Sequence, residues 1–228
     1  MWPRGVRDLD VLLGGGLRPG TLTLLAGRTM AGTSTLLLSI ARYNALRDRP
    51  VVVADLQHTL AETGRMFLAA SSNLGEGPAD AGRLAHAAER MRRLPLRLVG
   101  PGGDVIGRLR GEAVRGARLL LLDDLALAAG SLAPPEPGAV AAELARVARE
   151  LAVPVVATAH LGPEQGVGPR ASDLRDPHAL DHAAASVLLE RPARLGGHPG
   201  QPDLVTLHVT GPRAPAAQLS FLTRNIVV

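Results

Sequence analysis

Residues 21–34 read TLTLLAGRTMAGTS, an apolar run followed by a glycine-containing loop and the start of a segment with helical period. Gly27 and Gly32 occupy the glycine positions of the phosphate-binding pattern GxxxxGK[ST], and Ser34 occupies its hydroxyl position. Thr33 stands where the pattern has lysine. The stretch therefore predicts a strand, a phosphate-loop turn and a helix, without the cation that would reach the terminal phosphates.

Apolar runs on both sides of this loop alternate with stretches of helical period. Strands are predicted at 21–26, 51–55, about 97–99, 119–123 and 153–159, and helices near 33–46, from 59 onward, and at 78–93, 103–116 and 138–152. Runs that are apolar throughout and separated by helices are typical of a parallel sheet covered on both faces. At 228 residues the chain has the size of one domain, so we expect a single α/β domain over 1–228.

The end of the chain has a different pattern. The runs ASVLLE, LVTLHVT and QLSFLT are joined by turns rich in glycine and proline, with no helix between them. We therefore expect antiparallel strands that extend the mostly parallel sheet at its C-terminal end.

Composition narrows the class of protein. The absence of cysteine excludes a disulfide scaffold and thiolate metal sites. All 25 basic residues are arginine, and the net charge of +4 permits contact with nucleic acid without requiring it. One Trp, one Tyr and two Phe are too few for binding single strands by base stacking. Without a membrane-length apolar run or a signal peptide, we expect a cytoplasmic protein that makes no membrane contact.

The run LLLLDD at 119–124 provides a second candidate site residue. It ends a predicted strand at Asp123, about ninety residues after the phosphate loop. An acidic residue in this place is suited to hold the hydration shell of magnesium. We expect Asp123 to end an adjacent strand close to Ser34, so that the two side chains form a weak magnesium site.

These segments together resemble, nearly end to end, the C-terminal motor domain of DnaB-type replicative helicases in the RecA superfamily. The resemblance is carried by six stretches: GVRDLDVLLGGGLRPGTLTLLAGRTMAGTSTLLLSIA with its GL-x-PG turn, PVVVADLQHTLAETGRMFLA, LPLRLVGPGGDVIGRLR, ELARVARELAVPVVATAHL, RASDLRDPHALDHAAASVLLER with its SDLR segment, and TLHVTGPRAPAAQLSF. It implies a RecA-like P-loop NTPase fold, a Mg-ATP site and contact with DNA.

The resemblance also implies that catalytic groups are missing. The catalytic carboxylate of the family falls on Gln57, an amide that cannot act as a base, and the loop lysine falls on Thr33. The lysine and arginine that reach the neighbouring subunit's ATP site fall on Leu207 and Val209. A missing general base costs a rate factor of roughly 10²–10⁴, and a missing arginine finger roughly 10³–10⁵. No catalytic residue is therefore assigned.

Other positions of the motor domain are retained. The resemblance implies nucleotide contacts for Gly27, Arg28, Gly32, Thr33, Ser34 and His160, the last standing where the family has a glutamine sensor. Arg170 and Arg175 flank the loop where the family meets DNA, and we expect any DNA contact there to be weak.

The leading hypothesis is a degenerate paralogue that does not hydrolyse ATP, binds Mg-ATP or another nucleotide weakly or not at all, and acts as a binding or scaffold module. Its partner would be a DnaB-type helicase or another protein. The alternative is a working ATP-dependent helicase in which Arg28, Asp55 or Arg213 replaces the missing groups. A third alternative is that the protein has kept this fold but binds no ligand. Because the motor-like segment begins near Met1, we expect a monomer or small oligomer on its own.

Two further patterns have competing interpretations. His178 and His182 lie four residues apart and could share a helix face as zinc ligands, although solvated or hydrogen-bonded histidines are the simpler interpretation. Two groups of arginines could bind phosphate or simply form solvated helix faces. These groups are Arg90, Arg92, Arg93 and Arg97, and Arg108, Arg110, Arg115 and Arg118.

Overall fold

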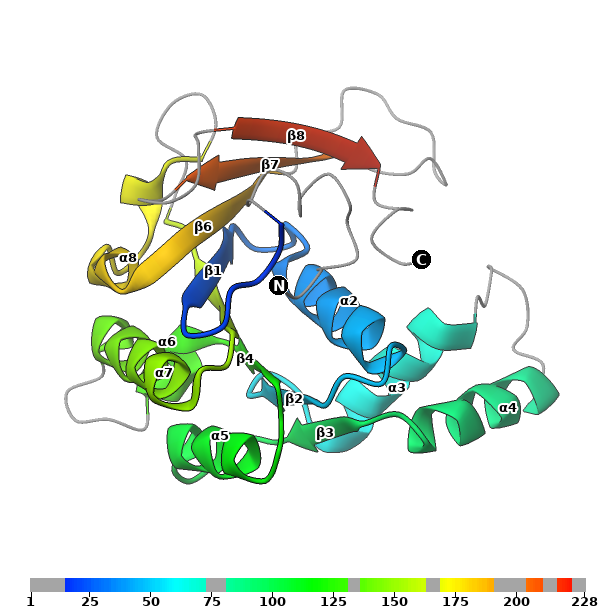
Figure 1. Ribbon diagram of the computed structural model, residues 1–228. Coiled ribbons are helices and arrows are strands. Elements are labelled where there is room, and N and C mark those ends of the chain that lie inside the picture. Colours follow the sequence, from blue (N-terminus) through cyan, green and yellow to red (C-terminus); the bar gives the residue numbers. More distant parts are fainter. Residues whose placement is uncertain are drawn as a thin grey trace.

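The computed structural model describes residues 15–72, 81–130, 136–162, 169–190, 204–210 and 217–222. Within these ranges the chain forms one sheet with the strand order β3-β2-β4-β5-β1-β6-β7-β8 (Figure 1). The strands are β1 Leu22–Gly27, β2 Val51–Asp55, β3 Leu96–Val99, β4 Leu119–Asp123, β5 Val155–His160, β6 Ala183–Glu190, β7 Leu204–Thr210 and β8 Ala217–Leu222. The expected α/β class with a mostly parallel sheet is confirmed.

The C-terminal strands are antiparallel, as expected, but only from β7 onward. β6 runs parallel to β1, whereas β7 pairs antiparallel with β6 and β8 pairs antiparallel with β7. The chain reaches β6 from β5 through a 3-10 turn, η1 (Ala171–Asp173), and a short helix, α8 (His178–Asp181). This connection lets the chain cross to the other side of β1, so β6 keeps the parallel direction.

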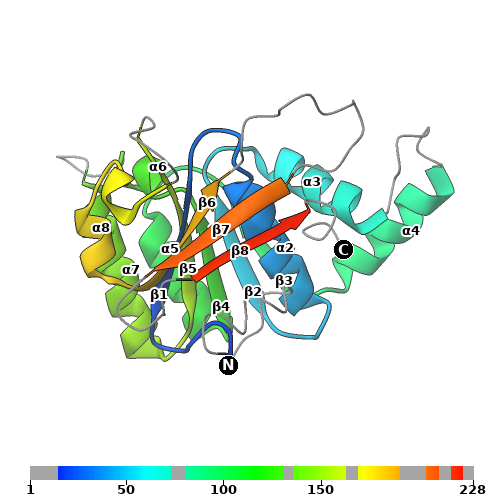
Figure 2. The ribbon, with the colours of Figure 1, turned by 90° about the horizontal axis from the view of Figure 1, so that it is seen from above.

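Helices cover both faces of the sheet (Figure 2). The first group is α2 Thr33–Ala45, α3 Leu60–Ser72 and α4 Ala81–Arg92. The second group is α5 Val105–Val114, α6 Leu125–Ala129, α7 Pro137–Leu151 and α8. Sequence reasoning missed α6 and α8, because five and four residues are too few to show a helical period.

Two hydrophobic cores explain why the strand runs are apolar throughout. In β1, Leu24 packs in the core beneath α5 and α7, while the next residue, Leu25, packs in the core beneath α2. In β4, Leu120 and Leu121 divide in the same way. Since successive strand side chains point to opposite faces, a strand buried on both faces needs an apolar residue at every position.

The strand order places the carboxyl ends of β1, β2, β4 and β5 at one edge of the sheet. β5 lies between β4 and β1, so the expectation that Asp123 ends a strand adjacent to the phosphate loop is wrong. Length and polarity patterns do not encode which parallel strands become neighbours. Among the described residues, no helix is both long and apolar enough to cross a membrane.

Candidate nucleotide site

The phosphate loop connects the end of β1 to the start of α2. A Cβ atom on Gly27 would lie 2.8 Å from the Cβ of Ala31 and 2.9 Å from Cγ2 of Thr33, so only glycine fits beneath this turn. Gly32 has φ +94° and precedes the first residue of α2, a conformation that favours glycine. No side chain caps α2, so the N–H groups of its first turn remain suited to an anion. This arrangement fits a phosphate group.

Thr33 is the first residue of α2, and its methyl group packs beside Gly27. A threonine side chain places no positive charge on the loop and is shorter than lysine by several bonds. The loop therefore retains its main-chain donors but lacks the cation that normally accompanies them.

Asp123 ends β4 and lies close to Ser34, although on a strand that is not adjacent to β1. The carboxylate is 2% exposed, and its Oδ1 accepts hydrogen bonds from Gln57 Nε2 at 3.0 Å and Thr158 Oγ1 at 2.5 Å. Burial raises the pKa of Asp123, hydrogen bonds with Thr158 and Ser34 lower it, and the nearby charges of Asp55 and Asp124 raise it further. Ser34 and Asp123 are thus in contact, which is the geometry expected of residues that would hold magnesium.

The side chain of Gln57 forms a hydrogen bond with the carboxylate of Asp123, the candidate magnesium ligand. In this position a glutamate would orient an attacking water, whereas the amide of Gln57 donates its N–H to Asp123. An amide cannot take up a proton, and the hydrogen bond that it donates occupies Oδ1 of Asp123. The side chain at the base position is therefore a structural partner of the candidate metal ligand.

Asp55 lies opposite Asp123 in the register of β2 and β4. Its carboxylate already accepts several hydrogen bonds. Its two oxygens accept hydrogen bonds from the main-chain N–H groups of Gln57 and His58 and from Oγ1 of Thr63 at 2.7 Å. His58 Nδ1 lies a further 3.0 Å from Oδ2 of Asp55. A carboxylate 2% exposed and held by this many partners is poorly placed to replace the missing base.

His160, the residue at the sensor position, ends β5 beside Gly27 of β1. Its Nε2 lies 2.7 Å from Oδ2 of Asp124, and this carboxylate also caps α6 by accepting the N–H of Leu127. The peptide bond between Asp123 and Asp124 is cis. His160 is therefore linked to the residue that follows the candidate magnesium ligand.

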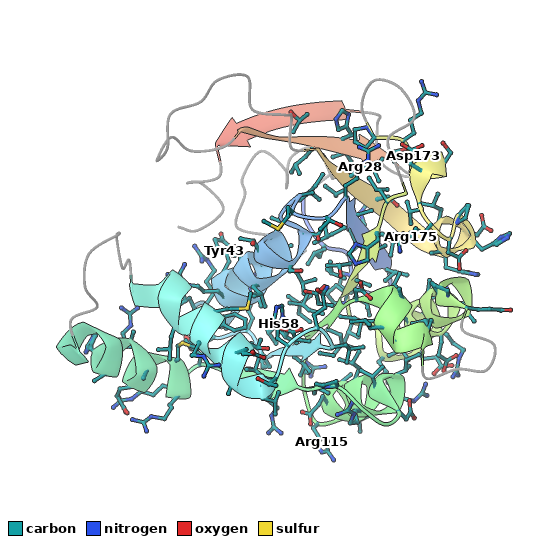
Figure 3. The ribbon with its side chains drawn as sticks, turned by 180° about the vertical axis from the view of Figure 1, so that it is seen from behind. Arg28, Tyr43, His58, Arg115, Asp173 and Arg175 are labelled. Atoms are coloured by element: carbon teal, nitrogen blue, oxygen red, sulfur yellow. The ribbon has the colours of Figure 1, made fainter. Side chains whose placement is uncertain are left out.

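Arg28 points from the phosphate loop toward the SDLR segment (Figure 3). Its Nε donates to the carbonyl oxygen of Gly162 at 3.3 Å, and its Nη2 lies 3.8 Å from Oδ2 of Asp173. Asp173 also accepts the main-chain N–H of Arg170, and its carbonyl oxygen accepts the N–H of Gly162. The guanidinium thus connects the loop to the segment expected to meet DNA.

Arg170 and Arg175 are both exposed and flank η1. The main-chain N–H of Arg175 donates to the carbonyl oxygen of His160, which fixes this segment to the end of β5. The positions of both side chains are compatible with phosphate contact, and their DNA role stays a prediction.

Leu207 and Val209 lie in β7 and are buried in the core that includes Val187 and Leu189. Side chains in this place pack inside their own subunit, so neither provides a group for a neighbour. Arg213, the third suggested substitute, lies outside the described residues.

The remaining sequence candidates are separate from this edge. His178 begins α8, is exposed, and lies 3.6 Å from Asp181. Across the described ranges no three histidine or acidic side chains gather as metal ligands. Most of the two arginine groups lie on α4, α5 and β3, where several members form ion pairs with Glu89, Glu112 and Glu150.

The family model described as "DnaB-like helicase C terminal domain" matches residues 2–195. The chain belongs to this family. The replicative DNA helicase DnaB of Leifsonia xyli subsp. xyli is 28% identical over 237 residues, which cover 92% of this chain and 52% of the relative. The DnaB of Treponema pallidum is 29% identical over 81% of this chain and 46% of the relative. The chain thus spans about half the length of these DnaB helicases.

A shorter match and two solved structures agree with this family. The DNA repair protein RadA of Mycobacterium tuberculosis is 37% identical over 89 residues, which cover 39% of this chain and 14% of the relative. One solved ATPase domain has the same fold, with a TM-score of 0.86 at 19% identity over 100% of this chain and 89% of that chain. A DnaB-like replicative helicase, solved for its interactions with primase, has a TM-score of 0.83 at 19% identity over 97% of this chain and 60% of that chain.

The DnaB-type resemblance found from the quoted motifs is confirmed, but sequence reasoning missed three residues of the site. Asp124, Thr158 and Asp173 all contact residues that the motifs identified. Thr158 is a polar residue inside the apolar run of β5, and this interruption is a signal that could have identified it.

Proposed function

We propose that this DnaB-like domain is a nucleotide- or partner-binding module that does not hydrolyse ATP at an enzymatic rate. The observation that carries the proposal is the hydrogen bond from Gln57 Nε2 to Asp123 Oδ1 at 3.0 Å. Through this bond, a hydrogen-bond donor stands at the position where the family resemblance implies a base. The bond also occupies one oxygen of Asp123, the candidate magnesium ligand. A base in this role normally contributes a rate factor of roughly 10²–10⁴.

Two of the three groups suggested as substitutes are engaged in other contacts. Asp55 accepts hydrogen bonds from its own β2–α3 connection, and Arg28 is held by the SDLR segment. This favours loss of hydrolysis over a rearranged helicase site.

Nucleotide binding, if retained, depends on the main-chain donors of the loop. Mg-ATP would be held by the N–H groups after Gly27, with Ser34 and Asp123 near the metal; the magnesium would supply the positive charge that the loop lacks. Three buried carboxylates, Asp55, Asp123 and Asp124, lie at the same edge. Without a lysine their charge opposes a phosphate anion, so we propose weak and strongly magnesium-dependent binding.

The proposed binding of a partner protein is supported by the family to which the chain belongs. One structural neighbour is a DnaB-like helicase studied with primase, and assembly with another protein is therefore a reasonable role for a domain that keeps this fold. We propose a DnaB-type helicase or another protein as the partner, with at most weak DNA contact through Arg170 and Arg175.

Calorimetry with ATP and ADP, each with magnesium and with EDTA, tests nucleotide binding by the purified chain. Steady-state ATP turnover, with and without single-stranded DNA, tests hydrolysis. We expect weak binding heats that require magnesium. We expect the ATP turnover to be no higher than in buffer without protein. Turnover above about 1 s⁻¹, the low end of ordinary enzymes, would contradict the proposal.

A further inference from the structure

Among the described strands, β3 forms the edge of the sheet opposite β8 and pairs only with β2 (Figure 1). The N–H of Val51 donates to the carbonyl oxygen of Pro95 at 2.8 Å, which sets the phase of the parallel ladder between β2 and β3. In this phase the main-chain groups of Arg97 face β2, whereas those of Leu98 face away from the sheet. An exposed strand edge of this kind is a template for another extended segment.

A groove runs beside this edge, on the face of β3 that is turned toward α5. It consists of two adjoining cavities of about 360 Å³ and about 570 Å³, both lined by Glu112 of α5 and by Arg115, the residue that follows this helix. The smaller cavity is also lined by apolar residues, including Pro50, Val52, Leu94 and Ala117. The larger cavity is also lined by Leu60, Leu98, Val99, Gly107 and Gly111, and by the oppositely charged residues Asp104 and Arg108. We call the two cavities together the β3–α5 groove.

Gly111 of α5 keeps this groove open, whereas Gly107 is explained by packing, since a Cβ atom there would clash with the carboxylate of Asp104. The helix buries Val105, Leu109 and Ala113 in the core and presents Gly107 and Gly111 to the larger cavity. A Cβ atom on Gly111 would meet only Arg115 Nη1, at an ordinary contact distance of 3.6 Å. Alanine is the better helix former, so neither packing nor helix propensity explains a glycine at this position.

The centre of the groove carries an excess of positive charge. Arg97 Nη1 lies 3.4 Å from one oxygen of Glu112, and Arg115 Nη1 lies 2.9 Å from the other. The two arginine side chains are 67% and 65% exposed, whereas that of Glu112 is 14% exposed. Figure 3 shows Arg115 projecting from this end of the molecule. Two guanidinium groups that share one partly buried carboxylate can accept a second carboxylate from outside.

We propose that the β3–α5 groove binds an extended acidic segment of a partner protein, which adds to the edge of β3 as a strand. Alternate side chains of such a strand enter the groove. The groove accommodates the order apolar, acidic, apolar: one apolar side chain in each cavity, and a carboxylate between them at Arg97 and Arg115. This site is independent of the nucleotide site and of its proposed function.

A short synthetic peptide tests the recognition on the whole chain. The probe has blocked ends, a fluorophore and the core Leu-Thr-Glu-Thr-Leu, and its binding is followed by fluorescence anisotropy. We expect saturable binding in the micromolar range that weakens about tenfold when the glutamate is replaced by lysine. No binding at about 1 mM protein would overturn the proposal.

Charge variants locate the contact. We expect the double variant Arg97→Glu, Arg115→Glu to lose affinity for the glutamate peptide about tenfold or more and to gain affinity for the lysine peptide. The matched control, Arg47→Glu with Arg149→Glu, changes the net charge equally at exposed arginines outside the groove. Equal losses in both double variants would show that the peptide responds only to the overall charge, which contradicts the proposal.

Three further measurements separate strand addition from other modes of binding. N-methylation at alternate peptide positions should abolish binding when the methylated N–H groups face β3, and should leave binding unchanged when they face away from it. Equal effects of the two sets of methyl groups would exclude a strand at the edge. Gly111→Leu should block the groove, whereas Gly111→Ala should keep binding, with thermal melting confirming that both variants fold. A single-stranded DNA that displaces the peptide and still binds Gly111→Leu would identify this surface as a nucleic-acid contact and overturn the proposal.

Discussion

The sequence resemblance implies a catalytic carboxylate at position 57, yet we expect replacing Gln57 by glutamate to destabilise the fold rather than to support hydrolysis. Gln57 Nε2 donates to the buried Oδ1 of Asp123, so a glutamate there would place a second carboxylate against it. Losing a hydrogen bond to a charged acceptor costs about 1.5–3 kcal/mol, and two like charges about 4 Å apart repel by about 1 kcal/mol in water. Because residue 57 is exposed, solvent reduces both effects, and we expect Gln57→Glu to lower the free energy of unfolding by about 1–3 kcal/mol at pH 8.

This loss of stability should shrink as the pH falls. Burial already raises the pKa of Asp123 above its usual value, and a second carboxylate beside it raises that pKa further. A carboxyl group whose pKa is higher in the folded state than in the unfolded state binds more protons when folded. Its destabilising effect is therefore present above the folded pKa and disappears as the pH falls through it.

Urea denaturation of the wild type and of Gln57→Glu at pH 5 and pH 8, in EDTA, measures the effect. Gln57→Leu is the matched control, because it removes the donor without adding a charge. Since residue 57 is exposed and water can replace the lost donor, this variant should cost about 1 kcal/mol and depend much less on pH. A Gln57→Glu variant as stable as the wild type at pH 8, or equally weakened at both pH values, would refute the reasoning.

Four further outcomes are expected. Thr33→Lys combined with Gln57→Glu should raise the affinity for Mg-ATP in calorimetry more than it raises turnover, because no arginine finger is supplied; brisk hydrolysis would contradict this. Arg28→Ala should speed amide hydrogen exchange in residues 169–175, whose segment its guanidinium contacts, without affecting exchange in α7. The affinity for DNA should be weak, with a shallow dependence of its logarithm on the logarithm of salt concentration, and sub-nanomolar binding at physiological salt would contradict it. Light scattering should find a monomer or small oligomer whose mass does not change with Mg-ATP, and a nucleotide-dependent hexamer would overturn this.

The fold could be predicted because the central parallel strands are buried on both faces. VVVAD and LLLLD have apolar side chains throughout, and such runs leave few alternatives to a sandwiched parallel sheet. The order of the strands could not be predicted in the same way. Placing β5 between β4 and β1 depends on how crossover helices pack, and this leaves no local mark in the sequence.

The candidate site could be predicted in part. Gly27, Gly32, Ser34 and Asp123 were identified because each has a position fixed by a phosphate or a metal ion. Pairs formed over long sequence separations were not identified. Arg28 contacts Gly162 and Asp173, more than 130 residues away, and only the folded chain shows that its guanidinium faces the SDLR segment.

The sheet edge keeps three buried carboxylates without a lysine, because each one has donors from this chain. Asp55 accepts from the β2–α3 connection and Thr63, and Asp123 accepts from Gln57 and Thr158. Asp124 caps α6 and pairs with His160. Buried carboxylates with this many donors do not require a bound metal or nucleotide to satisfy their hydrogen-bonding capacity. Gln57 has a structural role at this edge, since its amide supplies Asp123 with a donor that a glutamate would not supply. If hydrolysis is absent, as we propose, the edge does not need a bound nucleotide to keep its carboxylates hydrogen-bonded.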